Sequence, residues 1–177
     1  MDNVGAIQFI VAAGNLSFAE DLTRLTVAII LGGAIGLERE WKGHWAGLRT
    51  HILVSMGCAI FIIAGIEMVG HESESITRVI QGLASGIGFL GAGTILKLDQ
   101  SQEIKGLTTA ASIWLAASLG TAAGSGEYAL SIAAVLASLF VLGVLGPIES
   151  VFERRHKEHK DRRNKLAKDS GKSSQQE

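Results

Sequence analysis

The chain has 177 residues, of which 47% are hydrophobic and 22 are glycine, and its mean hydropathy is +0.32. Nine of the 16 Lys and Arg residues fall in residues 149–177, so an apolar, glycine-rich body precedes a charged tail, as is typical of a polytopic membrane protein. The lone Cys58 excludes a disulfide-built secreted module, and the formal net charge of −1 points to no nucleic-acid partner.

The N-terminal region opens with an apolar stretch, residues 4–14, that is too short to span a bilayer. We interpret it as an interfacial or re-entrant segment. The first positive side chain after Met1 is Arg24, so no secretory signal peptide is expected. The first spanning helix is expected to begin near Ser17, because Ser17 and Glu20 match the S-x-x-E capping box of a helix start.

Five segments are long and apolar enough to cross a bilayer, near residues 18–37, 50–70, 76–96, 107–123 and 127–146. Pro147 ends the last one, because proline cannot continue the helical hydrogen-bond ladder. The sequence therefore predicts an all-α membrane protein whose transmembrane domain, residues 1–147, is a bundle of about five helices. The charged tail, residues 148–177, is expected to be partly helical and then disordered, since it ends in Ser, Gln and Gly.

Positive charge predicts how the helices are oriented. Lys and Arg gather in the loops 38–49 and 97–106 and in the tail, whereas residues 1–17 and 124–126 have none. The positive-inside rule then places the N-terminus outside the cell and the tail in the cytoplasm. Trp41 and Trp45 fall at the cytoplasmic interface, where aromatic side chains are enriched.

A dense polar cluster follows the first predicted span. Arg49 opens the second span, where the helix dipole disfavours a positive charge, so we expect it to pair with Glu38 or Glu40 in a buried network. The alternative is a purely structural set of charges at a helix end. The candidate functional cluster consists of Glu38, Arg39, Glu40, Arg49, Thr50, His51, Lys97, Thr108 and Thr109.

Other polar residues have weaker expectations. Thr108 or Thr109 is expected to cap the fourth span and to join the network, and Glu67 could meet Arg78 across a short turn. The chain has no catalytic triad, no paired-His zinc site and no Walker loop. We therefore predict that it is not an enzyme and has no cofactor, and we leave magnesium binding open.

Glycine spacing predicts where helices pack closely. Gly32 and Gly36 form a G-x-x-x-G pair in the first span, which favours a close crossing. The third span contains a literal G-x-G-x-x-G, but a nucleotide site needs that motif between a strand and a helix, so we reject this interpretation. Helical geometry divides the glycines of this span between two faces, which predicts a central helix; a broken helix lining a polar cavity is the alternative. The packing glycines of this span are Gly82, Gly86, Gly88, Gly91 and Gly93.

The chain resembles the MgtC/SapB family of bacterial inner-membrane proteins over roughly residues 20–145. The resemblance is carried by Leu37 to Glu40, Ala46 to His51, Gly86 to Lys97 and Gly106 to Ala111, in matching order and spacing. It implies a multi-pass protein of the bacterial inner membrane that supports growth under magnesium limitation and, in pathogens, survival in host cells (virulence). Several members carry a cytoplasmic ACT-like domain; only about 30 residues follow Pro147 here, which indicates a short member without it.

The resemblance also implies how such a protein acts. Virulence members are similar to regulators that bind other membrane proteins, including the ATP synthase and a phosphate-sensing kinase. Our first hypothesis is therefore a non-enzymatic membrane regulator that works through helix–helix contacts in the lipid bilayer. The second is a small transporter or channel for an ion or small solute, with magnesium as one candidate cargo. Its pathway would run past Arg49, Glu38, Glu40 and the hydroxyls of Thr108 and Thr109. A homo-oligomer is expected under both.

Overall fold

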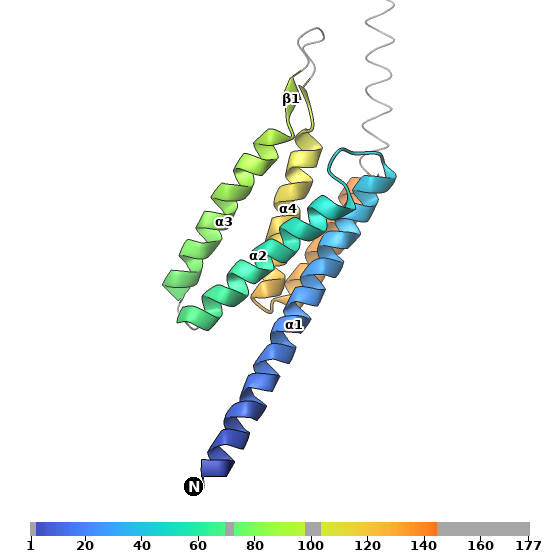
Figure 1. Ribbon diagram of the computed structural model, residues 1–177. Helices are drawn as coiled ribbons and strands as arrows, with labels where there is room; N and C mark the ends of the chain where they lie inside the picture. The colour runs from blue at the N-terminus through green and yellow to red at the C-terminus, as the bar shows by residue number, and fades with distance from the viewer. Residues whose placement is uncertain (1–2, 70–72, 98–103, 145–177) are drawn as a thin grey trace, which may run out of the picture. The chain divides into compact units, whose positions relative to one another are not determined.

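The computed structural model describes residues 3–69, 73–97 and 104–144, and five α-helices lie in these ranges (Figure 1). They are α1 (Asn3–Trp41), α2 (Leu48–Val69), α3 (Ser73–Gly93), α4 (Leu107–Gly124) and a fifth helix, Tyr128–Val144. Two-residue strands, β1 (Leu96–Lys97) and β2 (Ile104–Lys105), pair antiparallel between α3 and α4. The chain divides into two compact units, residues 1–137 and residues 138–177.

The expected helical fold class is confirmed, and each apolar segment coincides with a helix. The predicted tail, residues 148–177, lies outside the described residues, and the orientation in a membrane stays a prediction. The broken-helix alternative for the third span is wrong, because α3 is one uninterrupted α-helix from Ser73 to Gly93. Its G-x-G-x-x-G glycines therefore lie inside a helix and not in a strand-to-helix loop.

The beginning of α1 differs from the prediction. The helix starts at Asn3 and runs through Ser17 without a break, so Ser17 and Glu20 do not form a capping box. The reason is that no proline interrupts residues 3–41, and the backbone N–H groups near Ser17 are already bonded within the helix. The Ser17 hydroxyl instead donates to Glu67 Oε1 at 3.4 Å, and Glu67 does not meet Arg78, which pairs with Glu74 at 2.7 Å.

Three helices, α1, α2 and α4, form the tightly packed part of the first unit. A Cβ atom added at Gly32 would lie 2.7 Å from the His51 carbonyl oxygen, and one added at Gly36 would lie 2.8 Å from the Leu48 Cα. Gly120 of α4 meets the Ser55 backbone even more closely, and a Cβ at Gly124 would lie 2.9 Å from the Ala59 Cα. The glycines therefore let these three backbones touch.

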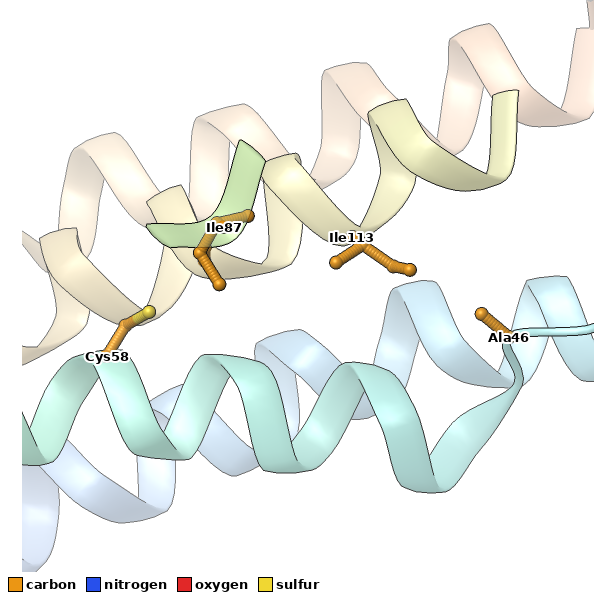
Figure 2. Close-up of a cluster of buried hydrophobic side chains, with 5 residues drawn as sticks. Ala46, Cys58, Ile87 and Ile113 are labelled. Atoms are coloured by element: carbon orange, nitrogen blue, oxygen red, sulfur yellow. The ribbon is translucent and has the colours of Figure 1, made fainter. Parts of the chain in front are cut away.

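The third helix, α3, lies beside α2 and α4 instead of at the centre (Figure 1). A Cβ added at Gly82, Gly86, Gly88 or Gly93 would meet no atom within 4 Å, and one at Gly91 would make ordinary contact with Ala110 at 3.7 Å. The prediction of a central third helix is therefore wrong for a single chain. Its inward contacts come instead from Ile87, which packs in a small buried cluster with Ala46, Cys58, Ile113 and Ala117 (Figure 2).

One helix, α2, meets the length and composition of a membrane span within the described ranges: it has 22 residues and a mean hydropathy of 2.3. Only 22% of its most apolar stretch is buried inside the protein, which distinguishes it from the core helix of a soluble domain. Length and composition alone do not identify the other four helices as membrane spans. Charged residues lower the hydropathy of α1 and α3, and small and hydroxyl-bearing residues lower that of α4. The fifth helix is apolar but short.

Large apolar side chains are nevertheless exposed on every helix of the first unit. Phe18 and Ile30 of α1, Phe61 of α2 and Phe89 of α3 are each more than half exposed, as is Leu130 of the fifth helix. Large apolar patches are rare on water-soluble monomers, where exposed apolar side chains are mostly scattered. These faces are suited to contact with lipid chains.

Candidate functional site

The candidate site lies at one end of the bundle, where α1 ends, α2 and α4 begin, and a short loop connects α1 to α2 (Figure 1). Helix α1 stops after Trp41 because Gly43 takes a left-handed conformation with φ 71°. The His44 N–H then donates to the Arg39 carbonyl at 3.0 Å, which turns the chain back toward the start of α2.

Arg39 is the most deeply buried charge of the site, with a side chain that is 3% exposed. Its Nε lies 3.0 Å from Glu38 Oε2, close enough for an ion pair, but the N–H is not aligned for a hydrogen bond. Its Nη2 donates a hydrogen bond to His44 Nε2. Glu38 also pairs with Lys42 Nζ at 2.7 Å. Arg39 Nη1 has no hydrogen-bond partner among the described residues. The four side chains thus hold the loop against the end of α1.

Glu40 caps the second helix from outside it. Its Oε2 accepts a hydrogen bond from the Leu48 N–H at 2.7 Å, so it satisfies one of the free N–H groups at the start of α2 and places a negative charge at the positive end of the helix dipole. Gly47 makes room for this carboxylate, because a Cβ at that position would collide with Glu40 Oε2.

His51 connects α2 to α4 inside the bundle and is fully buried. Its Nδ1 lies 2.8 Å from the Gly47 carbonyl oxygen, and its Nε2 lies 3.0 Å from the Ser112 hydroxyl. The same hydroxyl lies 2.8 Å from the Thr109 carbonyl oxygen, so its single hydrogen is shared between these two acceptors. One turn further along α2, the buried Ser55 hydroxyl donates to the Ala28 carbonyl of α1 at 2.8 Å. Each buried polar side chain of this row therefore has a partner on a neighbouring turn or helix.

The structure separates Arg49 from the acids that were expected to bind it. Arg49 is exposed and makes no ion pair within the described part of the chain, while Glu38 is taken by Arg39 and Lys42 and Glu40 by the Leu48 N–H. The predicted Arg49 network is wrong because Arg49 and His51 are two residues apart on one helix, about 200° around its axis. His51 faces inward, so Arg49 faces outward.

The remaining predicted residues divide in the same way. Thr109 is buried and Thr108 is exposed, but neither side chain caps α4. The N-cap is Gly106, whose φ of 94° and close approach to the Thr94 carbonyl leave no space for a side chain. Thr50 is half-buried and lines a cavity described below, and the side chain of Lys97 lies outside the described set.

A second buried arginine was not among the predicted site residues. Arg24 is 9% exposed, donates to the Gly124 carbonyl at 3.2 Å and pairs with Glu20. A guanidinium at the last carbonyls of α4 is favoured by the helix dipole. The sequence gives one signal for it, since Glu20 and Arg24 form an i, i+4 pair in the middle of α1.

The loop histidine has a perturbed acidity. Burial, and then the positive charge of Arg39, lower the pKa of His44 below its ordinary value, with Lys42 acting in the same direction and Glu38 against it. His44 is therefore favoured in its neutral form, which can accept the hydrogen bond from Arg39. Among the described residues, no group of three or more His, Cys, Asp or Glu side chains converges to hold a metal ion.

A cavity of about 310 Å³ lies next to the site, between the loop, α2, α3 and the first turns of α4. No charged side chain lines it. The lining residues are Trp45, Ala46, Thr50, Val54, Leu90, Gly93, Thr94 and Ile113.

The fold and the site define a helical membrane protein with a buried row of polar contacts at one end of its bundle. The chain belongs to the MgtC family, whose family model matches residues 25–151. The expected resemblance is thereby confirmed.

Several curated proteins are similar to the chain. An uncharacterized protein of Synechocystis, slr0014, is 45% identical over 72% of this chain and 51% of its own length. A protein of Escherichia coli K12 named "Putative magnesium transporter YhiD" is 44% identical over 71% of this chain and 60% of its own length. Protein MgtC of Salmonella typhimurium LT2 is 38% identical over 65% of this chain and 48% of its own length. The chain thus matches about half to three-fifths of these relatives, and no solved structure matches it.

Proposed function

We propose that the chain is a non-enzymatic, multi-pass protein of the bacterial inner membrane that supports adaptation to low magnesium or host conditions by regulating other membrane proteins. Membership of the MgtC family over residues 25–151 supports this role, as does the similarity to a protein named MgtC. Its partner would be a membrane protein, such as the ATP synthase or a sensor kinase, and the chain would also associate with copies of itself.

The observation that carries the proposal is the open glycine face of α3. Gly82 and Gly86, one turn apart on this face, are exposed, and a Cβ atom added at either of them would meet nothing within 4 Å. Small residues on a membrane helix let a second helix approach closely, and their open sides here are available to a helix from another protein. The tightly packed helices α1, α2 and α4 would then serve as the rigid support for this face.

The test compares two leucine substitutions in a bacterium whose own copy of the gene has been deleted and which is grown at low magnesium. Gly86→Leu blocks the α3 face and is expected to abolish complementation at a normal protein level. Gly57→Leu is the matched control, because Gly57 lies on α2 and also has open space beside it. Full complementation by Gly86→Leu would contradict regulation through α3.

A transporter is the second candidate function, and the buried polar row favours it. His51, Ser55 and Ser112 lie buried among α1, α2 and α4, and ionisable side chains such as His51 inside membrane proteins often mark ion pathways. The similarity to the relative named "Putative magnesium transporter YhiD" also supports this candidate.

Flux measurements separate the two functions. Purified protein is placed in liposomes, and magnesium and proton fluxes are recorded for the wild type, His51→Asn and Arg49→Ala. Flux that is lost in His51→Asn and kept in Arg49→Ala supports transport along the buried row, since Arg49 lies outside it. The absence of flux from folded, inserted wild-type protein supports the regulator.

A further inference from the structure

The cavity beside the site has the shape and chemistry of an apolar ligand site. Its walls come from the loop (Trp45), from α2 (Thr50 and Val54) and from α3 (Leu90 and Gly93). Of its two hydroxyl-bearing residues, Thr94 already donates to the Gly91 carbonyl at 2.8 Å. A polar ligand would lose its hydrogen bonds to water here without replacement, so the cavity favours a hydrocarbon group.

The shape of the cavity suits a flexible occupant. Its volume is about 310 Å³, and the loop, α2, α3 and α4 all contribute to its walls. Leu90, on the wall formed by α3, is 51% exposed, so the cavity is open to the surroundings there. A flexible acyl chain can follow such a half-open apolar space.

A positive charge neighbours the cavity-lining Thr50 in the sequence. Arg49 is adjacent to Thr50, is exposed, and makes no ion pair within the part of the chain that the structure describes. It lies in the first turn of α2, where the helix dipole disfavours a cation, so an anion beside it would be stabilising. A guanidinium binds phosphate through two parallel hydrogen bonds. Trp45, 89% exposed, is the kind of side chain that lies at the level of lipid headgroups.

We propose that this cavity binds one anionic phospholipid, with an acyl chain along Val54 and Leu90 and its phosphate at Arg49. The lipid would bridge α3 to α2, since residues of both helices line the cavity. The proposal does not depend on the regulatory function, because it concerns what the purified chain binds.

The experiment is native mass spectrometry of the full chain in detergent, titrated with phosphatidylglycerol or with phosphatidylcholine of the same acyl chains. The wild type is expected to bind one phosphatidylglycerol per chain, with about five-fold preference over phosphatidylcholine, as one arginine near a lipid headgroup provides. Equal binding of the two lipids, or no bound lipid, would overturn the proposal.

Two substitutions locate the lipid, each with a control that makes the same change elsewhere. Gly93 lines the cavity, and a Cβ atom added there would meet nothing within 4 Å. Gly93→Leu is therefore expected to weaken binding of both lipids at least about ten-fold, whereas Gly82→Leu on the same helix leaves binding unchanged. Arg49→Gln is expected to remove the preference for the anionic lipid, and Arg78→Gln, at the far end of α3, to keep it.

The other possible occupant, a second copy of the chain, gives a different result. If Gly93→Leu converted a dimer to a monomer and left lipid binding intact, the cavity would be a protein interface and the lipid proposal would be wrong.

Discussion

Two helices of this protein carry the same glycine spacing and use it differently. Gly32 and Gly36 of α1 are four residues apart, as are Gly82 and Gly86 of α3. The first pair lies against the backbone of α2, where added Cβ atoms would come within 2.8 Å of existing atoms. The second pair faces open space.

The difference shows that a G-x-x-x-G spacing permits close approach but does not say which helix approaches. In α1 the glycines share their face with Ala28 and Ile35, which are fully buried, so the whole face is committed to the core. Among the α3 residues whose burial the structure describes, only Ile87 and Gly91 are buried, and Gly82 and Gly86 remain on the outside. We therefore expect bulky substitutions at the packed glycines of α1 and α4 to reduce the stability of the fold. Bulky substitutions at the exposed glycines of α3 are expected to reduce association with other proteins instead.

The largest contrast is expected between Gly32→Leu and Gly86→Leu. A side chain at Gly32 must push against the His51 carbonyl and the Ser55 Cβ, so we expect destabilisation of about 3 kcal/mol or more. Gly86→Leu adds a side chain in open space and replaces glycine in a helix, so its stability should stay equal or rise by up to about 1 kcal/mol. Thermal unfolding in detergent measures both, and a destabilised Gly86→Leu would contradict the distinction.

The next contrast tests the buried polar row with two serines of α4. Ser112→Ala leaves the buried His51 Nε2 without its partner at 3.0 Å and is expected to cost about 1–3 kcal/mol. Ser118→Ala is the control, because the Ser118 hydroxyl donates only to the Trp114 carbonyl in its own helix and should matter by less than about 0.5 kcal/mol. Equal effects in chemical unfolding would mean that the His51 contact adds no stability.

A smaller contrast compares two glutamates. Glu40→Ala removes the acceptor of the Leu48 N–H at the start of α2, a capping loss of about 1 kcal/mol. Glu74→Ala removes an exposed partner of Arg78 at the start of α3, where an exposed ion pair contributes about 0–0.5 kcal/mol. Hydrogen exchange of the first turn of α2 should accelerate in Glu40→Ala only; unchanged protection there would rule out the capping role.

The helices could be predicted from sequence because long apolar runs are strong signals, and all five lie where the runs are. The start of α1 could not be predicted from the sequence, because the S-x-x-E pattern at Ser17 is equally compatible with the interior of a helix. The site was only partly predictable. The sequence shows that Glu38, Glu40, Arg39 and His51 lie close together. The contacts that each side chain makes depend on which side of α2 faces the bundle interior, and the clustering of polar residues does not determine that side.

A helical wheel of α2 contains the missing signal. His51, Ser55, Cys58, Ala59 and Ile62 follow a helical period and are all buried, so the small and polar residues of this apolar helix mark its inner face. Arg49 does not belong to that set. The polar pair Glu20 and Arg24 could likewise be noticed in α1, but its partner at Gly124 lies 100 residues further along the chain and is set by the fold.

The smallest expected effect is a pH dependence that belongs to the α1–α2 loop and not to α3. Burial and the charge of Arg39 lower the pKa of His44 in the folded protein below its unfolded value of about 6.5. The unfolded state then binds more protons than the folded state between these two pKa values, so stability rises with pH in that range. The contribution is complete above pH of about 6.5 and is lost as the pH falls through the lowered pKa.

The contact itself explains the direction of this dependence. Neutral His44 accepts the hydrogen bond from Arg39 through Nε2, whereas a protonated ring would point an N–H at the guanidinium. In His44→Gln the amide oxygen can accept from Arg39 at every pH. The difference in melting temperature between wild type and His44→Gln should therefore be constant above pH 7 and shift against the wild type as the pH falls toward 5, because all other titrating groups are shared. If the two curves of melting temperature against pH stayed parallel across this range, the protonation of His44 would not be coupled to its contact with Arg39.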